Sequence, residues 1–222
     1  QLDAHAADLL KRAVEARGIT VLLSAETIAI RGNDRAQGVA LKNGTEIEAD
    51  LVVVAAGIRP TVELAYGADL GIDRGILVDD HLQTSRAGIY AIGECAQHRG
   101  ICYGLVEPAY EQARVLAAHL AGEKTHYPGS VLATNLKVSG VNVFSAGDFL
   151  GTPGTEQLVL FDQGLCTYKK LVIRSGRLVG AVLFGDTADG LWYLDLMRSG
   201  ASIEAIRDDI IFGRTLAERK AA

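Results

Sequence analysis

The chain has 222 residues, of which 49% are hydrophobic and 22% charged, and it carries 25 glycines. This composition is that of a globular protein of one or two domains. The net charge of −5 provides no positive surface that would attract the phosphate backbone of a nucleic acid, so nucleic acid is not expected as a partner. Residues 51–58 form the longest apolar run, too short to cross a membrane. Three cysteines without C-x-x-C spacing exclude a zinc ribbon and favour a cytoplasmic location.

The first fifty residues predict one helix followed by strands. Apolar residues at helical spacing predict a helix over residues 3–17, and Gly18 is a natural stop. Ile19–Leu23 is rich in β-branched residues and predicts a strand. A small antiparallel meander is then expected, since turn signals separate three short runs: Glu26–Arg31, Gln37–Leu41 and Thr45–Ile47.

The middle of the chain predicts an α/β arrangement. Leu51–Val54 is a continuous apolar run, which is typical of a buried parallel strand. Ile76–Val78 and Ile89–Ile92 predict two more short strands. A helix is expected from Glu107 to about Ala121, because Pro108 stands at its first position and Gly122 lies beyond its end.

After residues 125–130 the pattern changes to successive strands, which indicates a domain boundary. A hairpin turn is expected at Arg174–Arg177, and two helices are expected to close the chain, at 188–198 and 202–207. The five expected strands are 134–138, 141–146, 157–161, 165–174 and 178–184.

Three strand or helix ends carry the residues that could bind a ligand. Gly93-Glu94 directly follows an apolar strand, where a glycine lets a ligand approach the backbone and a carboxylate can accept hydrogen bonds from ribose or ribityl hydroxyls. The helix starting at Glu107 offers first-turn amides and the positive end of its dipole. Ala56-Gly57 puts small residues at another strand end. Each feature alone fits an ordinary turn or helix equally well.

Other candidate chemistry is weak. The five histidines lack metal-ligand spacing, so no metal site is expected. Cys95 and Cys102 are more simply buried thiols than a redox pair. No residue is predicted to be catalytic in its own right.

The three ligand-binding features, in this order and spacing, resemble the C-terminal half of the flavoprotein reductases that have two dinucleotide-binding domains. The closest resemblance is to the NAD(P)H:FAD module of the assimilatory nitrite reductase large subunit, and rubredoxin reductases are the next relatives. The stretches that carry it are Tyr90-Ala91-Ile92-Gly93-Glu94-Cys95-Ala96, Tyr103-Gly104-Leu105-Val106-Glu107-Pro108 and Leu136-Lys137-Val138-Ser139-Gly140-Val141-Asn142-Val143.

The resemblance implies a partial, Rossmann-like α/β fold with an α+β C-terminal domain. Residues 1–56 would be the second half of an NAD(P)H-binding domain, 57–128 the end of an FAD-binding domain, and 129–222 a C-terminal interface domain. FAD and NAD(P)H are the implied cofactors. The implied partners are downstream iron–sulphur and sirohaem domains or an electron-acceptor protein, and a homodimer is possible in principle; no membrane partner is expected.

The resemblance also assigns roles to individual residues. Glu94 would hydrogen-bond the ribityl chain and Gly93 would allow close approach. The flavin pyrimidine edge would lie near Val106, Glu107 and Pro108. Ala56 and Gly57 would line the passage between nicotinamide and flavin. Lys137, with Asn135, would contribute from the C-terminal domain.

Two further readings stay open. A reductase of the same fold with a rubredoxin or ferredoxin acceptor fits the same motifs, and so does a non-catalytic docking or dimerisation unit. The chain lacks a G-x-G-x-x-G loop and begins at Gln1 without a leader. We therefore expect it to be a fragment that is inactive alone. The sequence does not distinguish NADH from NADPH.

Overall fold

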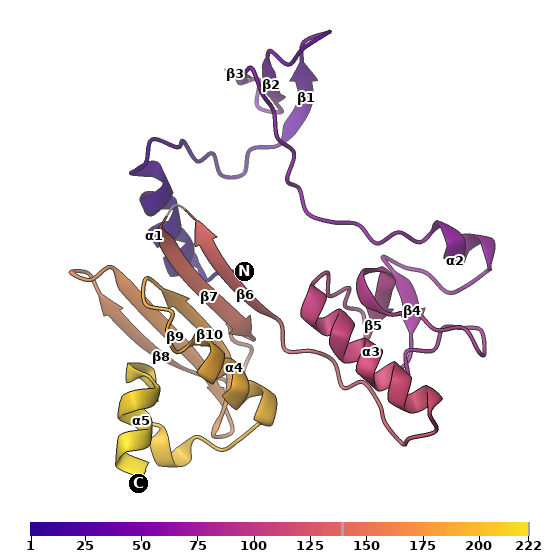
Figure 1. Cartoon of the computed structure of the whole chain (residues 1–222). Helices are drawn as coiled ribbons and strands as arrows, with labels where there is room; N and C mark the ends of the chain where they lie inside the picture. Colours follow the sequence, from indigo (N-terminus) through magenta and orange to yellow (C-terminus); the bar gives the residue numbers. More distant parts are fainter. Residues whose placement is uncertain (139, 222) are drawn as a thin grey trace. The chain divides into compact units, whose positions relative to one another are not determined.

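The computed structural model describes residues 1–138 and 140–221, and it mixes helices with sheets (Figure 1). The chain divides into two compact units, which are described separately. One comprises residues 14–59, and the other comprises residues 1–13 together with 60–222. Among the described residues, no helix has the length and apolar character needed to span a membrane.

The unit of residues 14–59 contains the expected meander. Its strands β1 (Thr27–Arg31), β2 (Gly38–Leu41) and β3 (Glu46–Glu48) pair antiparallel in that order. Ile30 pairs with Val39, and Val39 pairs with Ile47 on its other side. The central strand β2 is largely buried, whereas every residue of β1 is exposed. Burial in this meander is therefore largely confined to its central strand.

Two predicted strands of this unit are absent. Residues 19–23 and 51–54 have no strand conformation, and Leu51, Val53 and Val54 are 79%, 77% and 73% exposed. The prediction of a buried parallel strand at Leu51–Val54 was wrong for this structure. A parallel strand needs hydrogen-bonded neighbours and covered faces, and no described segment pairs with residues 51–54.

Residues 60–122 form a small α/β segment. It contains α2 (Glu63–Gly67), a parallel pair made by β4 (Ile76–Val78) and β5 (Ala96–His98), and α3 (Val106–Leu120). The predicted strand Ile89–Ile92 was wrong. Its backbone bonds close a turn instead, since Ile89 O accepts from Thr84 N at 2.9 Å and Ala91 N donates to Leu82 O at 3.1 Å. The partner of β4 is the strand that follows Glu94-Cys95.

The C-terminal region is a five-stranded antiparallel sheet of order β6-β7-β10-β9-β8. The predicted hairpin turn at Arg174–Arg177 is confirmed, because Arg174 pairs with Arg177 and Ser175 and Gly176 both have positive φ angles. The strands are β6 (Ala133–Val138), β7 (Val141–Gly147), β8 (Glu156–Asp162), β9 (Thr167–Arg174) and β10 (Arg177–Phe184).

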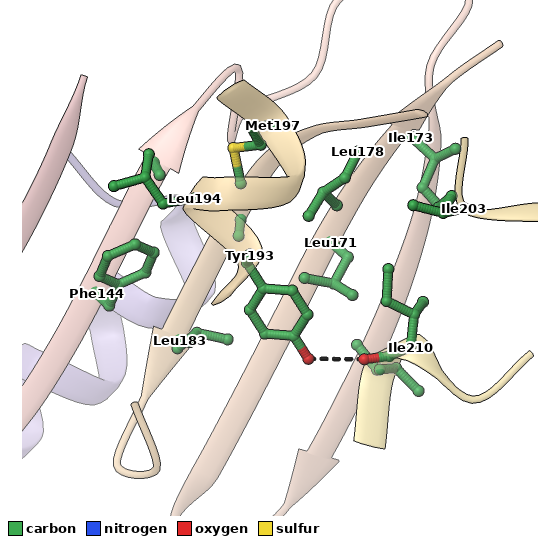
Figure 2. Close-up of a cluster of buried hydrophobic side chains, with 13 residues drawn as sticks. Phe144, Leu171, Ile173, Leu178, Leu183, Tyr193, Leu194, Met197, Ile203 and Ile210 are labelled. Carbon is green, nitrogen blue, oxygen red and sulfur yellow. Dashed lines mark hydrogen bonds between the residues drawn. The ribbon is translucent and has the colours of Figure 1, made fainter. Parts of the chain in front are cut away.

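Helices pack on both faces of this sheet. On one face, α4 (Gly190–Ser199) contributes Tyr193, Leu194 and Met197 to the main hydrophobic core, shown in Figure 2. The Tyr193 hydroxyl donates a hydrogen bond to the carbonyl oxygen of Ile210 at 2.7 Å. On the other face, α1 (Ala4–Glu15), which confirms the predicted first helix, buries Ala6 against Tyr168 and its neighbours.

Adjacent lysines of β9 point to opposite faces of the sheet. Lys169 lies 2.8 Å from Asp186 and 3.8 Å from Asp189, whereas Lys170 lies 3.4 Å from Asp3 on α1's side. Both lysine side chains are about nine-tenths buried, so each charge needs an acidic partner. Asp3 also accepts a hydrogen bond from the Tyr168 hydroxyl at 2.7 Å. These contacts attach α1 to the sheet.

The chain ends in short helical elements. The helix predicted at 202–207 is only a 3₁₀ turn, Glu204–Ile206, because the chain there makes single-turn bonds such as Ile206 N to Ile203 O. A second 3₁₀ turn, Ile210–Phe212, brings Ile210 into the core. The final helix α5 (Arg214–Ala221) was not predicted.

Candidate functional site

A pocket of about 350 Å³ lies beside the N-terminal half of α3. One wall is the turn that carries Glu94, and the other is the helix. The lining residues are Glu94, Gly104, Leu105, Val106, Ala109, Tyr110 and Ala113. The pocket thus combines one carboxylate with a mostly apolar wall, as small-molecule sites commonly do.

Gly93 fixes the position of the Glu94 turn. The Gly93 φ angle is +78°, a conformation that glycine adopts without strain. Its backbone N–H donates a hydrogen bond of 2.7 Å to Oε1 of Gln112, a fully buried side chain of α3. A buried amide that bonds a backbone group holds that group firmly. The turn at Gly93-Glu94 and helix α3 are therefore in direct contact.

The N-terminus of α3 opens toward this pocket. The residue before the first turn, Leu105, has extended backbone angles, and its side chain makes no capping hydrogen bond. Leu105 and Val106 both line the pocket and are 41% and 72% exposed. The first-turn amides and the positive end of the helix dipole therefore lie at the pocket wall, where they favour negative charge.

Glu107 and Glu111 lie four residues apart on α3 and face Arg198 of α4. The Arg198 guanidinium lies 2.8 Å from Glu107 and 3.6 Å from Glu111. Its hydrogen bond to Glu107 lowers the pKa of that carboxyl and raises the pKa of Arg198. Glu107 is therefore engaged by an arginine of the C-terminal sheet region.

The structure brings some of the predicted site residues together. Glu94 and Val106 line one pocket, and Gly93 is bonded to the helix behind it. Pro108 is buried in the first turn of α3.

Other predicted site residues lie elsewhere. Lys137 is an exposed residue of β6 and is not among the residues that line this pocket. Ala56 and Gly57 belong to the other compact unit, residues 14–59, and both are exposed there. Asn135, also on β6, is exposed as well.

Of the helical wall of the pocket, sequence reasoning predicted Val106 but missed Ala109, Tyr110 and Ala113. Val106, Ala109, Tyr110 and Ala113 follow an i, i+3, i+4, i+7 pattern, so they share one face of α3. Tyr110 is 63% exposed on that face. The sequence did carry a signal for this wall, because these residues form an apolar face on the helix that was expected to border the ligand. The role of Gln112 could not be predicted from such a pattern, because it depends on the hydrogen bond that Gln112 accepts from the backbone N–H of Gly93.

The cysteines and histidines form no additional site. Cys95, Cys102 and Cys166 are free thiols, and burial raises the pKa of Cys102, which makes it less reactive. Within residues 1–138 and 140–221, no group of three or more histidine, cysteine or acidic side chains could hold a metal ion.

The fold is that of the pyridine nucleotide-disulphide oxidoreductases. Residues 1–122, more than half of the chain, match the pyridine nucleotide-disulphide oxidoreductase family, and the chain belongs to it. Residues 133–201 match the C-terminal domain of rubredoxin NAD⁺ reductases. The predicted class, an α/β Rossmann-like fold with a C-terminal sheet domain, is confirmed.

Among curated proteins, the chain is 51% identical over 204 residues to the nitrite reductase [NAD(P)H] of Bacillus subtilis (strain 168). It is 41% identical over 212 residues to the assimilatory nitrate reductase electron transfer subunit of the same organism. These matches cover 91% and 95% of this chain but only 25% and 28% of the relatives. The chain therefore spans about a quarter of the length of these two proteins.

Solved structures show the same fold. An NAD-dependent persulfide reductase from A. fulgidus matches with a TM-score of 0.78 and 27% identity, covering 93% of this chain and 43% of that one. The putidaredoxin reductase–putidaredoxin complex matches with a TM-score of 0.80 over 99% of this chain and 54% of that one. At 19% identity, the second match shows the fold alone.

Proposed function

We propose that this chain is part of an NAD(P)H-dependent flavoprotein reductase that delivers electrons to a nitrite-reducing centre. The observation that carries the proposal is the joint placement of Glu94 and the N-terminus of α3 around one pocket. The match to the Bacillus subtilis nitrite reductase [NAD(P)H] over 91% of the chain supports the choice of acceptor. Two statements stay predictions: that the chain is a fragment of a longer protein, and that it is inactive by itself.

The residues of the pocket fit FAD. Glu94 offers a hydrogen-bond acceptor for hydroxyl groups, Gly93 leaves the backbone uncovered, and the first turn of α3 offers donors beside apolar surface at Val106. These are the groups that a ribityl chain and a flat ring with a polar edge require. When bound, the flavin would accept a hydride and release electrons singly or in pairs.

The protein's own residues would bind and orient this group. We assign the ribityl contact to Glu94 and close approach to Gly93, and we assign Val106, Glu107 and Pro108 to the end of the ring that meets α3. We also keep three further residues as cofactor contacts: Lys137, Ala56 and Gly57. NAD(P)H would be bound by residues 1–56. The domain limits 1–56, 57–128 and 129–222 belong to the same proposal.

The test is an absorbance spectrum of the full-length gene product after incubation with FAD and desalting. Retained absorbance near ~450 nm that bleaches when NADH or NADPH is added anaerobically supports the proposal. A Glu94→Ala variant should retain at least about tenfold less FAD, because the carboxylate acceptor is lost. Glu63→Ala, which changes an exposed carboxylate of α2, is the matched control and should retain FAD normally. A protein that binds no flavin would refute the proposal.

A rubredoxin-type acceptor is the second candidate. Residues 133–201 match the C-terminal domain of rubredoxin NAD⁺ reductases. The chain is also 35% identical over 192 residues to the rubredoxin-NAD(+) reductase of Acinetobacter baylyi (strain ATCC 33305 / BD413 / ADP1). Anaerobic oxidation of NAD(P)H by the full-length protein with nitrite or with a rubredoxin as acceptor separates the two. A homodimer, predicted from sequence, is tested by its mass in solution.

A further inference from the structure

An arginine from the sheet region partly offsets the charge of two carboxylates on the pocket helix. Arg198 stands in the last turn of α4, and its guanidinium contacts Glu107 and Glu111 of α3 at 2.8 and 3.6 Å. Glu107 directly follows Val106, which lines the pocket, and Glu111 directly follows Tyr110, which also lines it. The two carboxylates therefore stand in the first two turns behind the pocket wall.

Without a cation, these carboxylates would change the electrostatics of the pocket. The first-turn amides of α3 produce a positive potential that favours negative charge. Two carboxylates on the same turns weaken that potential toward any group in the pocket. Arg198 opposes them from outside the pocket, and its side chain is 31% exposed, so solvent screens the pair only partly.

The other charges around this group are few. Arg114 acts on Glu107 from α3 itself, and Asp195 acts on Arg198 from α4. Glu111 also accepts a hydrogen bond from the Ser130 hydroxyl. Arg198 is the cation that contacts both carboxylates in the described part of the chain. The pocket is also lined by the carboxylate of Glu94. Arg198 therefore reduces, but does not cancel, the negative charge at this end of α3.

We propose that Arg198 is a positioning residue of the flavin site, which acts through Glu107 and Glu111 to make the pocket end of α3 less negative and a bound flavin easier to reduce. This inference rests on the proposed function. It gives the C-terminal sheet region an electrostatic role in electron entry, although Arg198 itself does not line the pocket. Reduction adds negative charge to the flavin, so a more positive pocket favours the reduced form.

The experiment measures the midpoint potential of FAD bound to the full-length gene product, by equilibration with a reference dye. Arg198→Gln should lower the ratio of reduced to oxidised flavin at a fixed poise by about three- to tenfold, which is about 15 to 30 mV for a two-electron couple. Arg198→Lys keeps the charge and should stay close to the parent. Arg207→Gln, which removes a similarly exposed arginine paired with Glu156, is the control and should leave the potential unchanged.

A double variant separates charge from structure. Adding Glu107→Gln to Arg198→Gln removes one uncompensated carboxylate and should return the potential toward the parent value. An unchanged potential in Arg198→Gln, or a double variant that stays as low as the single one, would overturn the inference. If Arg198→Gln does not fold, Glu107→Gln alone still tests it, because removing a negative charge should raise the potential. Failure of the parent to bind FAD would instead refute the proposed function.

Discussion

The five-stranded sheet and the unit of residues 14–59 carry similar β-branched runs but bury them to different extents. Leu171 and Val172 of β9 are fully buried, whereas Val53 and Val54 are more than 70% exposed. The sheet has α1 on one face and α4 on the other, while β1 of the meander is exposed along its whole length. The difference teaches that an apolar run gains stability only where a second layer covers it.

The largest expected effect is a cavity in the covered sheet. Leu171→Ala removes a fully buried side chain from the main core (Figure 2) and should lower the free energy of unfolding by about 2 to 5 kcal/mol. Ile30→Ala, on exposed β1, should change it by less than about 0.5 kcal/mol. Urea unfolding followed by the fluorescence of Trp192, the single tryptophan and a residue packed on this core, measures both. Equal changes in the free energy of unfolding would contradict the contrast between the covered sheet and the exposed strand β1.

A close backbone contact within the sheet gives the next effect. A Cβ at Gly180 of β10 would lie 2.2 Å from the carbonyl oxygen of Asp148, so Gly180→Ala should cost about 1 to 3 kcal/mol. Gly67→Ala, where a Cβ would meet open space at the end of α2, is the control. The same urea titration measures both variants. A neutral Gly180→Ala variant would show that β10 and Asp148 separate easily.

The hydroxyl of Tyr193 tests the polar part of the core. Tyr193→Phe leaves the carbonyl of Ile210 without its 2.7 Å hydrogen bond and should destabilise by about 1 to 2 kcal/mol. Tyr66→Phe, at a 70% exposed position, should have no measurable effect. Thermal unfolding by circular dichroism measures the difference. A midpoint that does not change in Tyr193→Phe would mean that water replaces the lost donor.

The smallest effect is electrostatic and depends on pH. The hydrogen bond from Lys169 lowers the pKa of Asp186 below 3.8, so ionised Asp186 stabilises the folded state above that pH. This contribution is lost as pH falls from 3.8 through the lower folded-state pKa. Asp186→Asn should therefore cost less than about 1 kcal/mol at neutral pH, after solvent screening, and flatten the acid side of the stability curve.

An exposed ion pair of the other unit is the comparison for Asp186. Asp50 pairs with Arg35, and both side chains are highly exposed. Asp50→Asn should leave the pH profile of unfolding unchanged. Urea unfolding between pH 2.5 and 7 measures both variants. If the two substitutions change the pH profile of unfolding to the same extent, the burial of Lys169 does not strengthen its ion pair with Asp186.

The sequence predicted those parts of the fold that local patterns determine. The meander, the first helix, α3 and the strands of the C-terminal sheet follow from periodicity and turn residues such as Gly176. The strands expected at 19–23 and 51–54 fail because strand formation depends on a hydrogen-bonded neighbour, which a single run does not encode. Residues 89–92 do have a neighbour, but they pair with residues 82–84 only through the isolated bridge of Tyr90 with Gln83. The final helix α5 was missed because it lacks a strong apolar face.

The candidate site was predictable only in part. Strand-glycine-acid and helix-start signals predicted that Glu94 and the start of the helix at Glu107 flank one ligand, and the resemblance added Val106. In the structure, Glu94 and Val106 line one pocket. Gln112 bonds Gly93, and Arg198 bonds Glu107, across large sequence separations. Such pairings depend on how elements pack, so no local pattern reveals them. The cofactor roles of the predicted residues stay predictions.

The paired lysines of β9 have a consequence for how the sheet assembles. Because neighbouring residues of a strand face opposite sides, a slip of one residue would turn Lys169 and Lys170 each to the opposite face of the sheet. Each ammonium would then be buried away from its own acid, Asp186 on one side and Asp3 on the other. At least one of the two ammonium groups would then be buried without an acidic partner in such a misaligned pairing of β9. The two lysines therefore mark the correct alignment of the central hairpin during folding.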